Sequence, residues 1–158
     1  MKNNKLFCVC KRGTVFALLF LIFLFSNVQA ATVDEVKKSI VAQSVSMGVD
    51  PAIMLSIAKA ESGFRQEARG AGGLVGVFQL LPGTAKRLGV NPYDLNDNIK
   101  GGILYYKSMY NTFGSMELAV AAYNTGPDAI KRCNNTIPKH ARGFVSRIMA
   151  DYKYYKSN

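Results

Sequence analysis

The feature that most restricts the fold of this chain is a succession of short amphipathic helical patterns, interrupted once by a glycine-rich segment. Thr32 and Glu35 have the spacing of a capping box at a helix N-terminus. Val36, Ile40 and Met47 then recur at intervals that place them on one side of a helix. The first pattern therefore predicts a helix with a single apolar face, which needs other elements to cover it.

A second helix is predicted from Asp50 to about Ser62. Asp50 is a favourable N-cap, Pro51 suits the first helical position, and Gly63 suits the stop. The character of the chain then changes, because residues 69–76 contain four glycines, Gly70, Gly72, Gly73 and Gly76. Glycines at this density indicate backbone angles or close approaches that other residues do not tolerate.

The rest of the chain again favours helices. They are a short one from Leu81-Pro82 to Gly89, one from Asp97 to about Phe113 capped by Asn96, one from Met116 to Tyr123, a short piece from Gly126-Pro127, and one from about Ala141 to Tyr155. Residues 75–80 can hold short strand segments. We therefore predict one α+β domain that is predominantly α-helical, with a small Gly-rich or β insertion after the second helix.

The first thirty residues are set apart from this domain by their composition. Four basic residues precede an unbroken apolar run, Val15 to Phe25, and Val28-Gln29-Ala30 follows as a small-residue cleavage pattern. This order predicts a secretory signal peptide over residues 1–30 and a single domain over residues 31–158. An uncleaved anchor is the alternative, but the run is shorter than the roughly 20 apolar residues of a transmembrane helix. We expect an exported protein, periplasmic or secreted, with no stable membrane span after signal cleavage.

The charge and the reactive side chains limit the classes of function. All ten acidic residues and sixteen of the twenty basic ones follow residue 30, so this part carries a net charge of about +6. A basic protein suits an anionic partner, but no run of five or more basic residues marks a nucleic-acid-binding arm. Only Cys133 and His140 represent their residue types after residue 30, and no nucleotide-binding motif is present. We expect no metal, no cofactor and no nucleic-acid partner.

Glu61 is the candidate catalytic residue. It follows Ile53 and Ile57 at intervals of four, so it continues an apolar stripe of the second helix. It also lies at the C-terminal end of that helix, where the helix dipole disfavours a negative charge. Both effects favour the protonated carboxyl group that a general acid needs. The alternative is an exposed Glu at a fraying helix end, which is the more common situation for this residue type.

Tyr123 and Asn124 are a second candidate site, at the end of a predicted helix. A phenol and an amide side by side can bind sugar hydroxyls and N-acetyl groups while the ring packs on an apolar sugar face. The alternative is a core tyrosine followed by an asparagine that caps the helix.

Together these motifs resemble the catalytic domain of the soluble lytic transglycosylases, which have a lysozyme-like fold. The resemblance covers roughly residues 48–152. It rests on Val49-Asp50-Pro51, Glu61-Ser62-Gly63-Phe64, Gly76-Val77-Phe78-Gln79, Leu81-Pro82-Gly83-Thr84-Ala85, Asp97-Asn98-Ile99-Lys100-Gly101-Gly102 with Tyr105-Tyr106, Ala121-Ala122-Tyr123-Asn124-Thr125-Gly126-Pro127, and Ile137-Pro138.

The resemblance implies roles for individual residues. Glu61 would be the catalytic acid and base. The glycan cleft would be lined by Gln79, Tyr123, Asn124 and Phe78, with Phe78 in the position of the family's usual methionine, and Tyr152 of the last helix is a further candidate. Two departures affect substrate fit. Gly70 stands where the family often has a serine that is thought to hold an N-acetyl group. Residues 140–144 keep only Arg142 of a family motif.

The resemblance also implies the reaction. A lytic transglycosylase cleaves the β-1,4 bond between N-acetylmuramic acid and N-acetylglucosamine and leaves a 1,6-anhydromuramic end, without a metal or cofactor. The alternatives are a lysozyme-like peptidoglycan hydrolase, which would need a second carboxylate or a positioned water, and a non-catalytic wall-binding or assembly subunit. By analogy, a small exported enzyme of this type would serve general wall turnover or open a gap for an envelope secretion or conjugation machinery.

Overall fold

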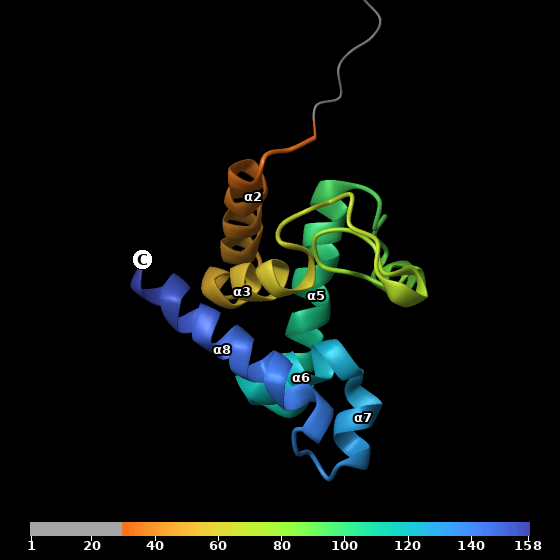
Figure 1. Cartoon of the computed structure of the whole chain (residues 1–158). Helices are drawn as coiled ribbons and strands as arrows, with labels where there is room; N and C mark the ends of the chain where they lie inside the picture. Colours follow the sequence, from red (N-terminus) through yellow and green to blue (C-terminus); the bar gives the residue numbers. More distant parts are fainter. Residues whose placement is uncertain (1–29) are drawn as a thin grey trace, which may run out of the picture. The chain divides into compact units, whose positions relative to one another are not determined.

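The computed structural model describes residues 30–158, and within this range the chain is predominantly helical (Figure 1). The predicted signal peptide falls on residues 1–30 and so lies outside the described residues except for Ala30. The elements are α2 (Val33–Ser46), α3 (Pro51–Ser62), η1 (Ala71–Gly73), α4 (Pro82–Leu88), α5 (Leu95–Phe113), α6 (Met116–Thr125), α7 (Pro127–Arg132), η2 (Lys139–Ala141) and α8 (Arg142–Ser157). None of the helices of residues 30–158 combines the length and the apolar character needed to cross a membrane.

The ends of α2 and α3 lie close to where the sequence predicts them. The Thr32 hydroxyl oxygen accepts from the backbone N–H of Glu35 at 3.3 Å, and the Glu35 carboxylate accepts from the backbone N–H of Thr32 at 2.8 Å. Asp50 accepts from the N–H of Ala52 at 3.0 Å at the start of α3, and Gly63 ends α3 in the left-handed region with φ 62°. These contacts confirm the capping box and both caps of α3.

The beginning of α5 differs from the prediction. Asp94 and not Asn96 is the N-cap, because the Asp94 carboxylate accepts from the N–H of Asp97 at 2.9 Å. The Asn96 side chain instead accepts from Ser39 of α2 at 3.1 Å. An asparagine and an aspartate two residues apart are both good caps, and the contact with α2 decides between them.

The glycine-rich segment contains two isolated antiparallel bridges, between Arg69 and Val75 and between Val75 and Leu80, and no strand is found within residues 30–158. Gly72, Gly73 and Gly76 have φ values of 73°, 83° and 80°, which turn the chain too sharply for a ladder to continue. The insertion is therefore an irregular loop with one 3₁₀ turn, and the predicted β character reduces to these bridges.

The core is built around α3, which is apolar on most of its surface. Ile53, Met54 and Ile57 are fully buried. Helix α3 packs against α2 and α8, and α5 packs against α6 (Figure 1). Residues 32–158 form one compact unit that contains this whole core. Helix α3 is therefore the central helix of the domain, and it is packed between other elements.

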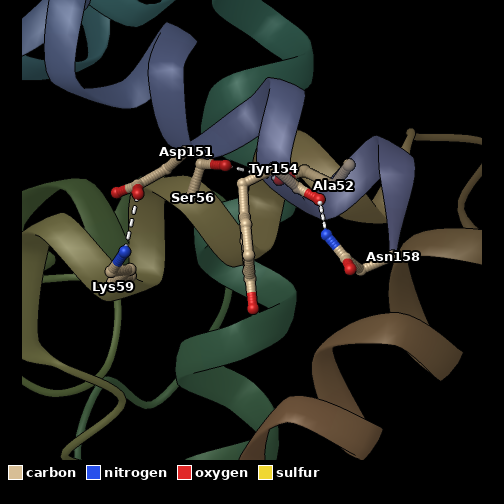
Figure 2. A network of polar contacts seen from close by, with 6 residues as sticks. All are labelled: Ala52, Ser56, Lys59, Asp151, Tyr154 and Asn158. Atoms are coloured by element: carbon tan, nitrogen blue, oxygen red, sulfur yellow. Dashed lines mark hydrogen bonds and ion pairs between the residues drawn. The ribbon is translucent and has the colours of Figure 1, made fainter.

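Three polar contacts join α3 and its N-cap to α8. The Lys59 ammonium group donates to Asp151 at 2.6 Å (Figure 2). At the other end of α3, Asp50 binds Lys156 at 3.0 Å and accepts from the Tyr152 hydroxyl at 3.1 Å. Partly exposed ion pairs contribute little stability individually. Their positions at the two ends of α3 fix how α8 lies along it.

Candidate active site

Hydrogen bonds of Ser62 connect the C-terminal end of α3 to the chain that follows it. Its hydroxyl donates to the carbonyl of Val77 at 2.8 Å and accepts from the N–H of Arg65 at 3.1 Å. Ser62 is buried, so both contacts are shielded from water. The preceding residue, Glu61, is in the last turn of α3 and lines the same cleft as Leu74 and Gln79.

Glu61 lies in a cleft of about 250 Å³. The cleft is lined by Glu61, Leu74, Gln79, Leu80, Leu81, Thr84, Tyr105, Tyr123, Asn124, Thr125 and Gly126. Glu61 is the one carboxyl group in this lining, as far as residues 30–158 are concerned. In the same part of the chain, no three His, Cys, Asp or Glu side chains lie close enough to share a metal ion. The chemistry of the described cleft is that of one acid among aromatic, amide and hydroxyl groups.

Burial raises the pKa of Glu61 from 4.5 to about 7, and the positive charge of Arg147 on α8 opposes this rise. The carboxylate is the form that loses hydration when the group is buried, so the neutral acid is favoured. At neutral pH both forms are populated. A carboxyl group of this kind can donate a proton and take one back.

Tyr123 and Asn124 are both in the cleft lining, but they present different surfaces. The Tyr123 hydroxyl donates to the carbonyl of Phe78 at 2.8 Å, and its ring lies 5.0 Å from that of Tyr105. Burial raises the pKa of Tyr123 well above its ordinary value, so the phenol stays neutral. Asn124 is exposed at the rim. The pair offers a ring surface beside a free amide.

Phe78 does not line the cleft, which corrects the sequence-based expectation. Its side chain is fully buried and packs against α5, where a Cβ atom at Gly102 would collide with the ring. What Phe78 contributes to the site is its backbone carbonyl, the acceptor for Tyr123. The expectation rested on the position of the family's usual methionine, whereas the space over Gly102 accommodates the Phe78 ring in the core.

Tyr152 is also absent from the cleft lining. Its hydroxyl donates to Asp50 at 3.1 Å, at the N-terminal end of α3 and therefore at the opposite end from Glu61. The structure thus brings together Glu61, Gln79, Tyr123 and Asn124 of the expected site.

Gln79 is held by the loop it belongs to. Its side-chain amide donates to the carbonyls of Gly76 at 2.8 Å and Ala68 at 3.4 Å, and its φ is 46°. A Cβ atom at Gly70 would collide with the amide oxygen of Gln79. Gly70 has a φ of −104°, which any residue adopts, so its missing side chain matters here for space. Gly70 and the orientation of Gln79 are therefore coupled.

The sequence analysis assigned no role in the site to Tyr105 or Asn98. Tyr105 lines the cleft, where its ring packs beside that of Tyr123. Asn98 is fully buried and accepts from the N–H of Phe78 at 2.8 Å, while its amide donates to the carbonyls of Val75 and Pro92, both at 2.9 Å. The available signal was a polar residue on the buried side of an amphipathic helix. Asn98 supports the loop backbone that carries Gln79.

Comparisons with known proteins identify the family of the chain. The profile of the transglycosylase SLT domain matches residues 38–142. A transglycosylase of Enterobacteria phage PRD1 is 33% identical over 90 residues, which are 56% of this chain and 34% of that protein. The soluble lytic murein transglycosylase of Escherichia coli (strain K12) is 27% identical over 128 residues, covering 65% of this chain and 20% of that protein.

Solved structures agree in fold. The 70 kDa soluble lytic transglycosylase of Escherichia coli superposes with a TM-score of 0.68 at 25% identity, over 76% of this chain and 24% of that one. An inactive mutant of the Pseudomonas aeruginosa lytic transglycosylase Slt gives 0.68 at 23% identity, over 77% of this chain and 24% of that one.

The fold is therefore that of the lysozyme-like soluble lytic transglycosylases. The chain belongs to the transglycosylase SLT domain family. It spans about one third of the phage relative and one fifth of the Escherichia coli relative that it matches.

Proposed function

We propose that this chain is a peptidoglycan lytic transglycosylase in which Glu61 is the single catalytic carboxyl group. The observation that carries the proposal is that Glu61, with a pKa of about 7, is the one acid lining an aromatic cleft in the described part of an SLT-family domain. The proposed substrate is the glycan strand, cleaved at the β-1,4 bond between N-acetylmuramic acid and N-acetylglucosamine.

The proposed reaction needs one acid because the substrate supplies the nucleophile. Protonated Glu61 donates its proton to the glycosidic oxygen while the bond from that oxygen to C1 of the muramic residue breaks. The N-acetyl oxygen of the same sugar stabilises the developing positive charge. Glu61, now a carboxylate, accepts the proton of the C6 hydroxyl as that oxygen bonds to C1. The products are a free N-acetylglucosamine hydroxyl and a 1,6-anhydromuramic end, with no water consumed.

The lining of the cleft supports this reaction over hydrolysis. Glycosidases that use water or a covalent intermediate generally place two carboxyl groups across the bond. Asp94 and Asp97 are not in the cleft lining, since Asp94 caps α5 and Asp97 accepts from the N–H of Asn91 at 2.8 Å. Tyr123 and Asn124 are proposed to hold the sugar, with the amide of Asn124 free to bind an N-acetyl group.

The setting of the reaction is also part of the proposal. Export of the chain, to the periplasm or beyond, rests on the pattern of residues 1–30, and a cell-wall substrate requires it. General wall turnover and the opening of a gap for a secretion or conjugation machinery use the same chemistry.

The test is the analysis of products released from purified peptidoglycan by residues 31–158. The proposal predicts soluble muropeptides with 1,6-anhydro ends, which are one water lighter in mass spectrometry than the corresponding hydrolysis products. Reducing muramic ends would show a hydrolase instead. Binding to the polymer without release would show a wall-binding subunit.

The rate is expected to depend on pH through Glu61. Because the donor must be protonated, the rate should fall about tenfold per pH unit above the pKa of about 7. Arg147 lowers this pKa, so Arg147→Ala should move the falling limb to higher pH. Lys153→Ala, an exposed cation of the same helix, is the matched control and should leave the profile unchanged. A rate that stays level to pH 9 would contradict the role of Glu61 as the donor.

Gly70→Ala is expected to lower the rate of glycan release about tenfold, because displacing Gln79 alters the cleft wall. Gly83→Ala is the control, since a Cβ atom there meets no atom within 4 Å and Gly83 lies in sequence between the cleft-lining residues Leu81 and Thr84. Initial rates on the same peptidoglycan give the comparison. In a Gln79→Ala background the Gly70→Ala change should have little further effect. Equal effects in both backgrounds would mean that Gly70 acts by another route.

A further inference from the structure

A second hollow of about 330 Å³ lies between the α2–α3 turn, the C-terminal half of α5 and the start of α6. It shares no lining residue with the cleft that contains Glu61. Its lining includes Asp50, Ile53, Tyr106, Tyr110 and Asn111. Its volume lies at the lower end of the roughly 300–1,000 Å³ range of small-ligand pockets. The proposed reaction makes no use of it.

Tyr106 has a polar group that the protein leaves unused. Only 4% of the residue is exposed, and within residues 30–158 its hydroxyl makes no hydrogen bond, unlike those of Tyr123 and Tyr152. The single polar side-chain atom that is both fully enclosed and unpaired in this part of the chain belongs to Ser44. The Tyr106 hydroxyl is therefore not fully enclosed, and Tyr106 is one of the residues that line the hollow. A ligand there would find an unpaired donor and acceptor.

The rim of the hollow adds an aromatic surface and an amide. Tyr110 is 44% exposed and its ring stacks on that of Tyr106, with centroids 6.3 Å apart and planes at 29°. Asn111 is exposed beside it. The solvent-exposed ring of Tyr110 lies next to hydroxyl and amide groups. This combination suits a ligand that has both an apolar face and hydroxyl groups.

The charged groups of the hollow are already paired. Asp50 binds Lys156 at 3.0 Å and accepts from Tyr152 at 3.1 Å. Lys107 donates to the carbonyl of Met47 at 2.8 Å. A neutral ligand therefore fits this lining better than a charged one, because it leaves these contacts in place.

We propose that this hollow binds an N-acetylhexosamine unit of a glycan strand, at a place separate from the cleft. The inference rests on the proposed function, since it assigns the same polymer to both sites. Two tyrosines and an asparagine line each hollow, Tyr105, Tyr123 and Asn124 in the cleft and Tyr106, Tyr110 and Asn111 in the second hollow. Consecutive tyrosines of α5 thus serve the two sites.

Two sites on one polymer have a kinetic consequence. A domain held at the second hollow stays near the strand after each cleavage, which raises the effective concentration of glycan at the cleft. A short soluble fragment fills one site at a time and gains nothing. The second hollow should therefore matter for intact peptidoglycan and not for small substrates.

The binding test is a nuclear magnetic resonance titration of the Glu61→Gln variant of residues 31–158 with tri-N-acetylchitotriose. The inference predicts shifts of the backbone amides of Tyr110 and Asn111, lost in a Tyr110→Ala background while those of Asn124 persist. No shift at Tyr110 and Asn111 overturns it. The response of Asn124 reports on the cleft separately, so failure of this inference and failure of the proposed function are distinguishable.

The functional test compares rates on intact peptidoglycan and on a soluble tetrasaccharide fragment. Tyr110→Ala and Tyr106→Phe should each lower the rate on the polymer about fivefold and leave the fragment rate unchanged. Tyr154→Ala is the control, because Tyr154 is 59% exposed on α8 and lines neither hollow. Equal losses on both substrates, or no loss on the polymer, overturn the inference. So does a concentration-dependent dimer that Tyr110→Ala abolishes, which would assign the hollow to a second copy of the chain.

Discussion

Glu61→Gln is expected to reduce the release of glycan fragments on the order of 10³-fold, the range seen when a general acid and base is removed. Glutamine keeps the shape of the side chain, but its amide neither donates a proton to the glycosidic oxygen nor accepts one from the C6 hydroxyl. The measurement is the initial rate of soluble muropeptide release from purified peptidoglycan at pH 6. A loss of less than tenfold would remove Glu61 from the reaction.

The same substitution has an opposite effect on stability, which serves as its folding control. The pKa of Glu61 is about 7 in the folded chain and 4.5 as a reference value, so the folded state binds more protons between these values. The free energy of unfolding of the wild type therefore falls as pH rises from about 4.5 to 7. Glu61→Gln avoids this loss and should be more stable by up to about 3 kcal/mol at pH 8, with no gain near pH 4. Urea unfolding at the two pH values measures the difference, and a less stable variant at pH 8 would contradict the burial of Glu61.

Asn98→Ala is expected to lower the free energy of unfolding by about 3 kcal/mol or more. The change leaves the N–H of Phe78 and the carbonyls of Val75 and Pro92 without their partner in a site that is closed to water. Each unpaired buried group costs about 1–3 kcal/mol, although water entering the gap offsets a part of this. The measurement is urea or thermal unfolding of residues 31–158.

Asn96→Ala provides the matched control for Asn98. Both asparagines are in the first turns of α5, but Asn96 is exposed and its amide oxygen accepts from Ser39 and Gln43 at 3.1 and 3.4 Å. Its loss should cost less than about 1 kcal/mol. Similar costs for the two substitutions would mean that the Asn98 contacts are not what holds the loop.

The parts of the fold that the sequence predicted well depend on neighbouring residues. The capping box of Thr32 and Glu35, the cap at Asp50 and the glycine stop at Gly63 are all decided within four residues along the chain. The order of the helices follows from such signals and from the apolar period. The glycine-rich segment is evident in the sequence, but whether it holds strands is not, because several positive φ angles together decide it.

The parts that were missed depend on contacts between distant residues. Asn98 forms hydrogen bonds with Val75 and Phe78, which are 23 and 20 positions away along the chain. Phe78 turns inward because α5 leaves a space over Gly102, and Tyr152 binds Asp50 at the far end of α3. No local pattern contains these partners. Of the expected site, local patterns indicated Glu61 at a helix end and the adjacent pair Tyr123 and Asn124, and these three residues line one cleft. Their roles stay predictions.

The contact between Gly70 and Gln79 is another feature of the site that depends on residues apart in the sequence and that no local pattern predicts. In the sequence, Gly70 is only a departure from a family pattern, at a position where the family's serine is thought to hold an N-acetyl group. In the structure, the Gln79 amide occupies the space that a side chain at position 70 would fill. A missing side chain is informative only once its spatial neighbour is known.

The central claim, that the C6 hydroxyl of the substrate and not water completes the reaction, is tested most directly by digesting peptidoglycan in water enriched in the heavy oxygen isotope. We expect released muropeptides with 1,6-anhydro ends and no heavy oxygen, and about 10³-fold slower release of these products by Glu61→Gln. Heavy oxygen at the muramic C1 of the initial products would contradict it, because water would then be the nucleophile.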